Sequence, residues 1–430
     1  SKRLRTNWIR YNPKLSDIDQ KINQYFREFP TKPRDSCYQK ALSLTHQDFK
    51  LNKRNIRHCN DVIRHYPHPD RSPGLPWTQK GFRSKREVPT SIIRWTVHKM
   101  KYNEIKFKTP CTAAHKTVVQ EAGKNKFRLI WVYPVEMTIA EGMFAQPLIN
   151  AYNSQHDTTY AIWYRWQKGD MHHLNSKLTP TTEWLGFDYS SFDVNVPAWL
   201  IRDAFSILRE QLNFKEYEYY GKPTDVNTLD NLWKQVVNYF INTPIKMKSG
   251  KIVVTKSGVP SGSYFTNLID SVCNTIMMHY MLLKLNITYY DHYAMGDDGL
   301  VRVKKGSAKL DEFAKLASNV FGAELNPDKS EIGQYIHWLG YRLGPQYPTI
   351  DIDKAIAQLL VPSKPDWFET DVLIRAKAIY ISSFCDPTLR RLLEEHGLLS
   401  EIKRIYKNDV IEKMQYLHLN IDDLTSRLLV

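Results

Sequence analysis

Short stretches of alternating apolar and polar residues in the middle of the chain predict strands. Residues 116–134, KTVVQEAGKNKFRLIWVYP, alternate basic and apolar side chains as extended strands do. Residues 287–303, ITYYDHYAMGDDGLVRV, predict two strands joined by a tight turn. Residues 243–258 predict a hairpin that turns at Ser249 and Gly250. The centre of the chain is therefore expected to contain antiparallel sheet.

Helical periodicity follows or separates these strands. A short strand, EWLGFD, is expected at 183–188, and a helix after it at 197–212 with a proline at its first turn. An apolar helix is predicted from about 263 to 285 and an amphipathic one over 307–321. From about residue 351 onward the chain is predicted to be mostly helical.

Composition indicates one large globular body. The chain has 430 residues, 42% hydrophobic and 24% charged, without repeats, low-complexity tracts or Gly/Ser linkers, so interleaved lobes are expected. No run of about 18 apolar residues is present, and we expect no membrane span. The five cysteines include no C-x-x-C pair, which favours a reducing compartment over a disulfide framework. The chain begins at Ser1 rather than Met, as a fragment or a processed product does.

The net charge of +15 is unevenly distributed. Residues 1–130 contain 29 basic and 10 acidic residues, whereas the remaining 300 contain 31 and 35. A solubilising surface would not predict this separation. A basic third beside an acidic centre favours a polyanion as partner, with nucleic acid first among the candidates.

The acidic pair Asp297-Asp298 follows Gly296 in the predicted turn. Gly and Asp are ordinary turn residues, so the pair alone is weak evidence for a site. Adjacent carboxylates repel each other unless a cation or a proton separates them, and their oxygens suit Mg²⁺ or Mn²⁺. A metal site at the turn would need a third carboxylate.

Asp188 and Asp193 supply that candidate. Asp188 ends the predicted strand, where a rigid element would hold a ligand, and Asp193 lies five residues further on. In the alternative interpretation, Asp188 begins a turn, and Asp193 or Asn195 caps the following helix.

A loop rich in hydroxyl groups lies between the two acidic regions. Residues 257–274, SGVPSGSYFTNLIDSVCN, contain two Ser-Gly pairs and then the start of a helix. Thr266, Asp270 and Asn274 are spaced i, i+4, i+8 and share one helix face. This polar face either meets a ligand or forms a hydrogen-bond network in the core.

The order D-x4-D, then Ser-Gly-x3-Thr, then Gly-Asp-Asp resembles motifs A, B and C of viral RNA-dependent RNA polymerases. The segments DYSSFDVNVPAWLIRDAF and SGVPSGSYFTNLIDS are similar to those of partitiviruses, with picobirnaviruses next. Four further segments resemble motifs G, F, D and E of this family: SPGLPW (72–77), KNKFRLIWVYP (124–134), NPDKS (326–330) and HWLGY (337–341).

The resemblance implies an α+β right-hand polymerase, with fingers, a palm of antiparallel sheet and helices, and a helical thumb. The expected boundaries are a basic N-terminal extension that bridges fingers and thumb over 1–71, fingers over 72–183, palm over 184–345 and thumb over 346–430. Within the palm, a finger insertion is expected at about 213–256.

The resemblance also implies roles for individual residues. Asp188, Asp297 and Asp298 would be catalytic ligands of two Mg²⁺ ions, with Mn²⁺ as a substitute, and Lys329 would protonate the pyrophosphate. Where many relatives have Asn, this chain has Asp270, so whether Asp270 or Asn274 assists Asp193 stays open. The expected contacts to the nucleotide triphosphate and ribose are Lys124, Lys126, Arg128, Asp193, Ser261, Gly262, Thr266 and Asn274. Those along the template path are Ser72, Pro73 and Gly74.

The implied function is RNA-dependent RNA polymerase of a double-stranded RNA virus, copying RNA for transcription and genome replication. The implied partners are RNA template and product, nucleoside triphosphates and the viral capsid protein, without a membrane. The expected location is inside the viral particle in the host cytoplasm. Two alternatives are a two-metal nuclease and a non-catalytic RNA-binding or capsid-associated protein. Nucleotide incorporation on an RNA template separates the three.

Overall fold

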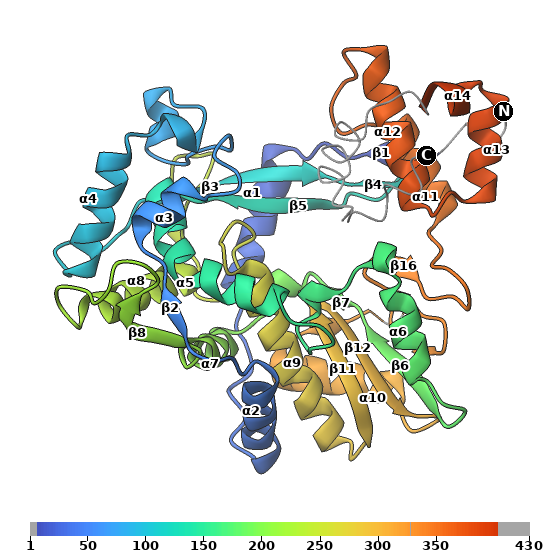
Figure 1. Cartoon of the computed structure of the whole chain (residues 1–430), viewed down its shortest axis with the longest axis horizontal. Coiled ribbons are helices and arrows are strands. Elements are labelled where there is room, and N and C mark those ends of the chain that lie inside the picture. Colours follow the sequence, from blue (N-terminus) through green and yellow to red (C-terminus); the bar gives the residue numbers. More distant parts are fainter. Residues whose placement is uncertain (1–6, 327, 403–430) are drawn as a thin grey trace.

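A computed structural model describes residues 7–326 and 328–402 of the chain (Figure 1). Its central sheet is antiparallel, in the order β11-β12-β6-β14. Helix α9, Thr266–Lys284, packs against β11 and β12. The strands of the central sheet are β6 Thr182–Phe187, β11 Tyr289–Met295, β12 Asp298–Lys304 and β14 Glu331–Gly333.

A second sheet combines the strands predicted in residues 116–134 with the hairpin predicted at 243–258. Its order is β10-β9-β3-β5, with β3 antiparallel to β5 and parallel to β9. Near it, β1 pairs with β4, which ties the N-terminal region to this part of the molecule. These strands are β1 Trp8–Arg10, β3 Cys111–Thr117, β4 Val119–Glu121, β5 Phe127–Val132, β9 Pro244–Lys246 and β10 Ile252–Val254.

Helices surround the two sheets, and small strand pairs join them. Helix α2 packs on α9, while α5 lies between the N-terminal helices and α8. The helices are α1 Leu15–Asn23, α2 Ser36–Asp48, α3 Cys59–Arg64, α4 Thr90–Lys101, α5 Val135–Asn153, α6 Asp170–Lys177, α7 Ala198–Arg209, α8 Thr228–Ile241 and α10 Leu310–Leu316. The pairs are β2 Arg54–Ile56 with β8 Leu212–Tyr217, β7 Tyr189–Ser190 with β13 Glu324–Leu325, and β15 His337–Trp338 with β16 Tyr341–Arg342.

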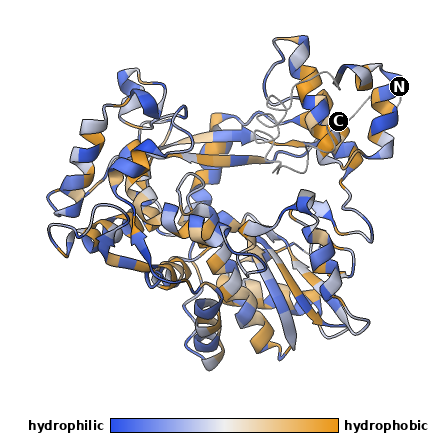
Figure 2. Ribbon diagram, in the orientation of Figure 1, coloured by the Kyte–Doolittle hydropathy of each residue, from blue (hydrophilic) through white to orange (hydrophobic). Residues whose placement is uncertain are grey.

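The C-terminal part of the described chain is helical, as predicted. Its helices share a small core of their own, separate from the main core that runs through the sheets, α5 and α9. Figure 2 shows hydrophobic residues passing through the centre of the molecule, with hydrophilic ones on the outer helices. The four helices are α11 Ile352–Leu360, α12 Glu369–Ser382, α13 Pro387–Glu395 and α14 Leu398–Ile402.

The predicted elements are present, with small shifts at their ends. Helix α9 begins at Thr266, three residues later than expected, because residues before it belong to the Ser-Gly loop. Pro197 precedes α7 as its N-cap, without a side-chain cap. Asp193 lies in a single 3₁₀ turn, and the Asn195 amide donates to the Ser190 carbonyl at 2.8 Å. Neither residue caps α7, so the capping interpretation is wrong.

Several predictions concern residues outside the described range. Residues 1–6 of the expected extension, Pro327 of the motif D segment and 403–430 of the expected thumb fall there. The four domain boundaries stay a prediction. Within residues 7–326 and 328–402, no helix is both long enough and apolar enough to span a membrane.

Candidate active site

Strand register brings the acidic residues of two strands together. In the β6–β12 ladder Phe187 is opposite Gly299, so Asp188, the next residue after Phe187, adjoins Asp298, the residue before Gly299. Asp188 is fixed at the backbone, where its N–H donates to Ser330 Oγ at 3.2 Å and its carbonyl accepts from Asn326 N–H at 2.8 Å. The third carboxylate predicted from sequence therefore lies beside the Gly-Asp-Asp turn.

The turn itself is held by helix α9. The Asn274 side-chain amide donates to the carbonyls of Gly296 and Asp297 at 3.1 and 2.9 Å. Ser271 Oγ accepts from the Gly296 N–H at 2.8 Å, and Gly296 has a positive φ of 65°. Asn274 is fully buried and braces the turn, so its position favours a structural role over contact with ribose.

Mutual repulsion and burial raise the pKa values of the two turn carboxylates. For Asp298, burial is the largest cause, followed by the charges of Asp297 and Asp188. Burial and the charge of Asp193 raise the pKa of Asp297. Crowded carboxylate oxygens with raised proton affinity are a donor set that fits hard divalent cations, since a cation would relieve the repulsion that a proton otherwise relieves.

A second acidic pair lies next to the first. Burial raises the pKa of Asp193, opposed by a hydrogen bond from Ser261 Oγ and by the charge of Arg128. Burial and the negative charges of Asp193 and Asp297 raise the pKa of Asp270 well above its usual range, and the two carboxyl groups share a hydrogen bond. Burial and the neighbouring carboxylates therefore favour the protonated form of Asp270. Its Oδ1 is buried without a hydrogen-bond partner among the described residues.

The Ser-Gly loop is anchored on three sides. A Cβ placed on Gly262 would lie 1.8 Å from the carbonyl oxygen of Trp131, so only glycine fits against β5. The Val259 N–H donates to the Asp193 carbonyl at 2.7 Å. Thr266 Oγ1 donates to the Pro260 carbonyl at 2.7 Å, closing the loop onto the start of α9. The loop backbone is thereby fixed beside Asp193.

Glu141 on α5 is a further anchor of the loop. It accepts from Ser263 Oγ and from the Tyr264 N–H, both at 2.8 Å. Burial raises the pKa of Glu141 to about 8. This residue was missed in the sequence, where the available signal was one of two acidic residues in a mainly apolar helix.

Of the predicted phosphate-binding cations, Arg128 reaches the acidic cluster. Its charge lowers the pKa values of Asp193, Asp297 and Asp298. Lys124 forms an exposed ion pair with Glu121 at 2.6 Å.

Lys126 and Lys21 lie close to this group. Lys126 is positioned by its backbone, whose N–H donates to Gln120 at 2.8 Å. Lys21, which sequence reasoning missed, donates to the Phe127 carbonyl. Burial lowers the pKa of Lys21; the charge of Asp193 opposes this effect, and the charges of Arg128 and Lys126 add to it. Nothing in its sequence context separates it from other lysines of the N-terminal region.

Lys329 approaches the carboxylates from the segment before β14. Its Nζ lies 3.8 Å from Asp188 Oδ1, and the side chain is just over half exposed. A cavity of about 730 Å³ joins this corner of the sheet to the C-terminal helices. Its lining includes Asp188, Asp298 and Lys329 on one side, and Lys354 and Gln358 of α11 on the other. The acidic site thus faces an open cavity bordered by α11 and α12.

The predicted template loop packs on the end of β5. A Cβ on Gly74, which has a φ of +72°, would lie 2.5 Å from the Tyr133 carbonyl oxygen. The Pro73 carbonyl accepts from the Val135 N–H at 2.9 Å, and the Ser72 carbonyl accepts from Lys85 Nζ at 2.6 Å. The loop is therefore rigidly placed beside the second sheet.

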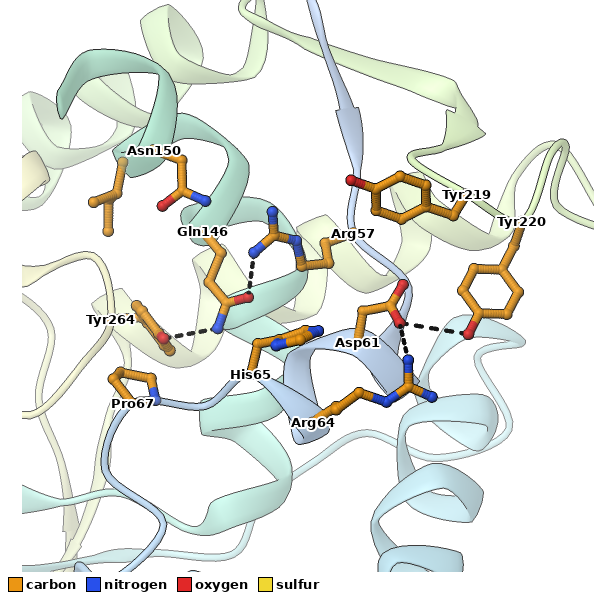
Figure 3. Close-up of a pocket in the computed structure, with 11 residues that line it drawn as sticks. Arg57, Asp61, Arg64, His65, Pro67, Gln146, Asn150, Tyr219, Tyr220 and Tyr264 are labelled. Atoms are coloured by element: carbon orange, nitrogen blue, oxygen red, sulfur yellow. Dashed lines mark hydrogen bonds and ion pairs between the residues drawn. The ribbon is translucent and has the colours of Figure 1, made fainter. Parts of the chain in front are cut away.

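A second cavity, of about 820 Å³, lies between α3, α5 and the loop after β8. Figure 3 shows Gln146 linking Arg57 to the hydroxyl of Tyr264. Tyr264 lies two residues after the second Ser-Gly pair of the loop. On the opposite wall, Asp61 binds Arg64 and the Tyr220 hydroxyl. Its basic and aromatic lining borders the Ser-Gly loop but contains none of the catalytic carboxylates predicted from sequence.

Comparison with known proteins agrees with this geometry. Residues 15–342 match the family model for viral RNA-dependent RNA polymerase. The RNA-directed RNA polymerase of Cryptosporidium parvum virus 1 is 25% identical, over 97% of this chain and 86% of that protein. That of White clover cryptic virus 1 is 26% identical, over 50% of this chain and 38% of that protein.

Solved structures show the same fold. The polymerase of a human picobirnavirus is 18% identical with a TM-score of 0.65, covering 92% of this chain and 74% of that chain. The Sicinivirus 3Dpol polymerase is 15% identical with a TM-score of 0.75, covering 92% and 88%. The predicted α+β polymerase fold and the predicted RNA-directed RNA polymerase of a partitivirus-like double-stranded RNA virus are confirmed. The chain therefore belongs to the viral RNA-dependent RNA polymerases.

Proposed function

We propose that Asp188, Asp297 and Asp298 form the catalytic centre that adds nucleotides to a growing RNA strand. The observation that carries this assignment is the β6–β12 register, which puts Asp188 next to the Gly-Asp-Asp turn. Polymerases of this family use divalent metal ions. Two Mg²⁺ ions held by the three carboxylates would activate the RNA 3′-hydroxyl and neutralise charge on the leaving pyrophosphate.

The surrounding side chains position the nucleotide. Arg128 is suited to the triphosphate because its guanidinium can grip phosphate in a bidentate manner and its charge already reaches the carboxylates. Lys126 and Lys21 add positive charge on the same side, while Lys124 lies further out in its pair with Glu121. Lys329, exposed at the edge of the cavity, supplies the proton to the departing pyrophosphate.

Asp193 and Asp270 select ribose in this proposal. Asp193 presents a buried carboxylate fixed by Ser261 and Asp270, and Asp270 has an unpartnered oxygen. A 2′-hydroxyl can hydrogen-bond to such a pair, whereas deoxyribose leaves it unsatisfied. We assign Asp270 rather than Asn274 as the partner of Asp193, because Asp270 hydrogen-bonds to Asp193, whereas the Asn274 amide donates to the carbonyls of Gly296 and Asp297. Gly262 and Thr266 act by holding the loop.

The template approaches across the 820 Å³ cavity and the loop containing Ser72, Pro73 and Gly74. Tyr219 is 81% exposed, and basic side chains line the same cavity. Exposed aromatic rings beside basic side chains suit single-stranded RNA, whose bases stack while its phosphates meet positive charge. Contact with the viral capsid protein and a location inside the particle rest on kinship alone, and co-sedimentation of the polymerase with purified capsids tests them.

The central test is Asp297→Asn. Primer extension on an RNA template with Mg²⁺ should fall below about one thousandth of wild type, because the substitution removes a metal ligand. RNA affinity should change less than about twofold, since binding depends on distant cations. Asp311→Asn, at an exposed site on α10, is the matched control and should keep full activity. Normal extension by Asp297→Asn would disprove the catalytic assignment.

A further inference from the structure

Three side chains from separate elements converge away from the catalytic carboxylates. They are Asp48 at the end of α2, His279 in α9 and His292 in β11. One potential ligand atom from each lies within 4.8 Å of the other two. Asp48 is more than 200 residues from both histidines in the sequence, so no local spacing pattern reveals the cluster.

The histidines aim at a single point. His279 Nε2 and His292 Nε2 lie 2.7 and 2.8 Å from the same oxygen, Asp48 Oδ2. Convergence of two imidazole nitrogens and one carboxylate oxygen is the arrangement that a single ion requires, whereas separate ion pairs would leave the two rings free to use both carboxylate oxygens.

The second ring nitrogen, Nδ1, of each histidine also has a hydrogen-bond partner. His279 Nδ1 lies 2.6 Å from the Tyr289 hydroxyl, and His292 Nδ1 lies 3.3 Å from the Tyr290 carbonyl oxygen. Histidines that bind a metal through one nitrogen almost always donate the other N–H to an oxygen, which fixes the ring orientation. Both rings are therefore positioned as ligands usually are.

The geometry points to a zinc site formed by Asp48, His279 and His292. Two imidazoles and one carboxylate are borderline ligands that favour Zn²⁺ over Mg²⁺. The side chain of His279 is 1% exposed, whereas those of Asp48 and His292 are 17% and 16% exposed, so water can complete a fourth position.

Binding requires only a small expansion. Ligands about 2.0 to 2.1 Å from a tetrahedral ion lie roughly 3.3 Å from one another. The present nitrogen–oxygen distances of 2.7 and 2.8 Å are those of hydrogen bonds, so each pair would separate by about half an ångström. Zinc binding requires an unprotonated Nε2 on each ring, so a neutral ring must carry its single proton on Nδ1, where His279 faces the Tyr289 hydroxyl and His292 the Tyr290 carbonyl oxygen. A second proton on either ring would leave to water.

Such a site would fasten the N-terminal region to the catalytic scaffold. Helix α2 belongs to that region, α9 carries Asn274, which braces the Gly-Asp-Asp turn, and β11 leads into the same turn. The zinc would cross-link all three elements without touching the nucleotide. Its role is structural, and it is distinct from the proposed magnesium site.

Metal content of the full chain, purified without a histidine tag and dialysed against Mg²⁺, tests the inference. About one zinc per chain is expected in the wild type and in Asp297→Asn, falling below about a tenth in Asp48→Ala and His292→Ala. His46→Ala is the matched control, because His46 lies on the same helix α2 but pairs with Glu210 at the surface. It should retain the zinc.

Cobalt substitution keeps the test decisive if the variants fold poorly. Wild-type chain titrated with Co²⁺ in excess Mg²⁺ should develop visible absorption of a four-coordinate site, which Zn²⁺ abolishes. A chelator should lower the melting temperature of the wild type and of His46→Ala. Absence of zinc and of the cobalt band in folded wild type, or zinc content unchanged in both ligand variants, would overturn the inference. The three residues would then form a metal-free hydrogen-bonded cluster.

Discussion

Asp193 and Asp270 are neighbouring carboxyl groups with different electrostatic surroundings. Burial raises the pKa of each, and the negative charge of Asp193 raises that of Asp270 further, which favours a proton on Asp270. The pair resembles an Asp–Asn pair in its hydrogen bonding, with the protonated carboxyl as donor.

Substitution of Asp193 should alter sugar selection. Asp193→Ala removes an acceptor that a ribose hydroxyl would use, and hydrogen bonds to charged groups contribute about 1.5 to 3 kcal/mol. The ratio of kcat/KM for NTP over dNTP should therefore fall roughly 10- to 100-fold, chiefly through slower use of NTP. Single-nucleotide incorporation measures both substrates.

Two further variants distinguish a role in sugar selection from a structural role. Asp270→Asn keeps a donor toward Asp193 and should change the ratio by less than about threefold. Asn274→Ala releases the Gly-Asp-Asp turn and should slow both substrates alike. An unchanged ratio in Asp193→Ala would leave that residue with a purely structural role at the Ser-Gly loop.

At the level of elements, the Ser-Gly loop is positioned by helix α5. Glu141 accepts two hydrogen bonds from the loop and is completely buried. The folded protein keeps its proton up to about pH 8, whereas the unfolded chain loses it near pH 4.5. The folded state binds more protons in this window, so stability from this group is complete below about pH 4.5 and declines as pH rises to about 8.

Glu141→Gln should remove that decline. The neutral amide fills the same buried space and its oxygen can accept from the Tyr264 N–H, but it has no proton to lose in this pH range. Between about pH 5 and 8 the free energy of unfolding of the variant should rise relative to wild type, by at most about 1.4 kcal/mol per pH unit. Urea unfolding at several pH values measures the difference. Glu394→Gln, at an exposed ion pair, should show none, and parallel curves for Glu141→Gln would refute a buried titration.

The sequence predicted those parts of the site that local pattern specifies. The strand before Asp188, the hairpin at the acidic pair and the helix after the Ser-Gly loop each follow from periodicity and turn residues. Lys21, Glu141 and His279 could not be found in this way, because their roles come from contacts across 106, 122 and 231 residues. Tertiary pairing of single side chains leaves no periodic signal.

For the whole molecule, charge is divided between a basic N-terminal third and a nearly neutral remainder. The basic part contributes β3 and most of β5 to the second sheet, together with the predicted template loop and much of the lining of the 820 Å³ cavity, while the predicted catalytic carboxylates lie at the central sheet. In the proposed function, the basic region would attract RNA and the carboxylates of the central sheet would carry out the reaction.

RNA binding should depend steeply on salt. The logarithm of affinity for single-stranded RNA should fall linearly with the logarithm of salt concentration, with a slope of about 0.7 per phosphate contacted. Arg64→Ala should reduce the slope by about 0.7, whereas Tyr219→Ala should weaken binding at every salt concentration without changing the slope. Fluorescence anisotropy gives both quantities. Tyr290→Ala, an exposed tyrosine on β11, is the control, and equal effects of Tyr219→Ala and Tyr290→Ala would exclude the cavity from the template path.

The tie made by Arg10 has a consequence for the order in which the chain folds during synthesis. Arg10 pairs with β4 through its strand and donates from Nε to the Val361 carbonyl at 2.7 Å, a contact that spans 351 residues. Domains emerge from the ribosome starting with the N-terminus, and contacts of such separation form late because loop closure costs entropy. The hydrogen bond from Arg10 to Val361 can therefore form only after residue 361 has been synthesised. A nascent or truncated polymerase that ends before α11 lacks this hydrogen bond. The contact between β1 and the end of α11 is therefore made only when most of the described chain has been synthesised.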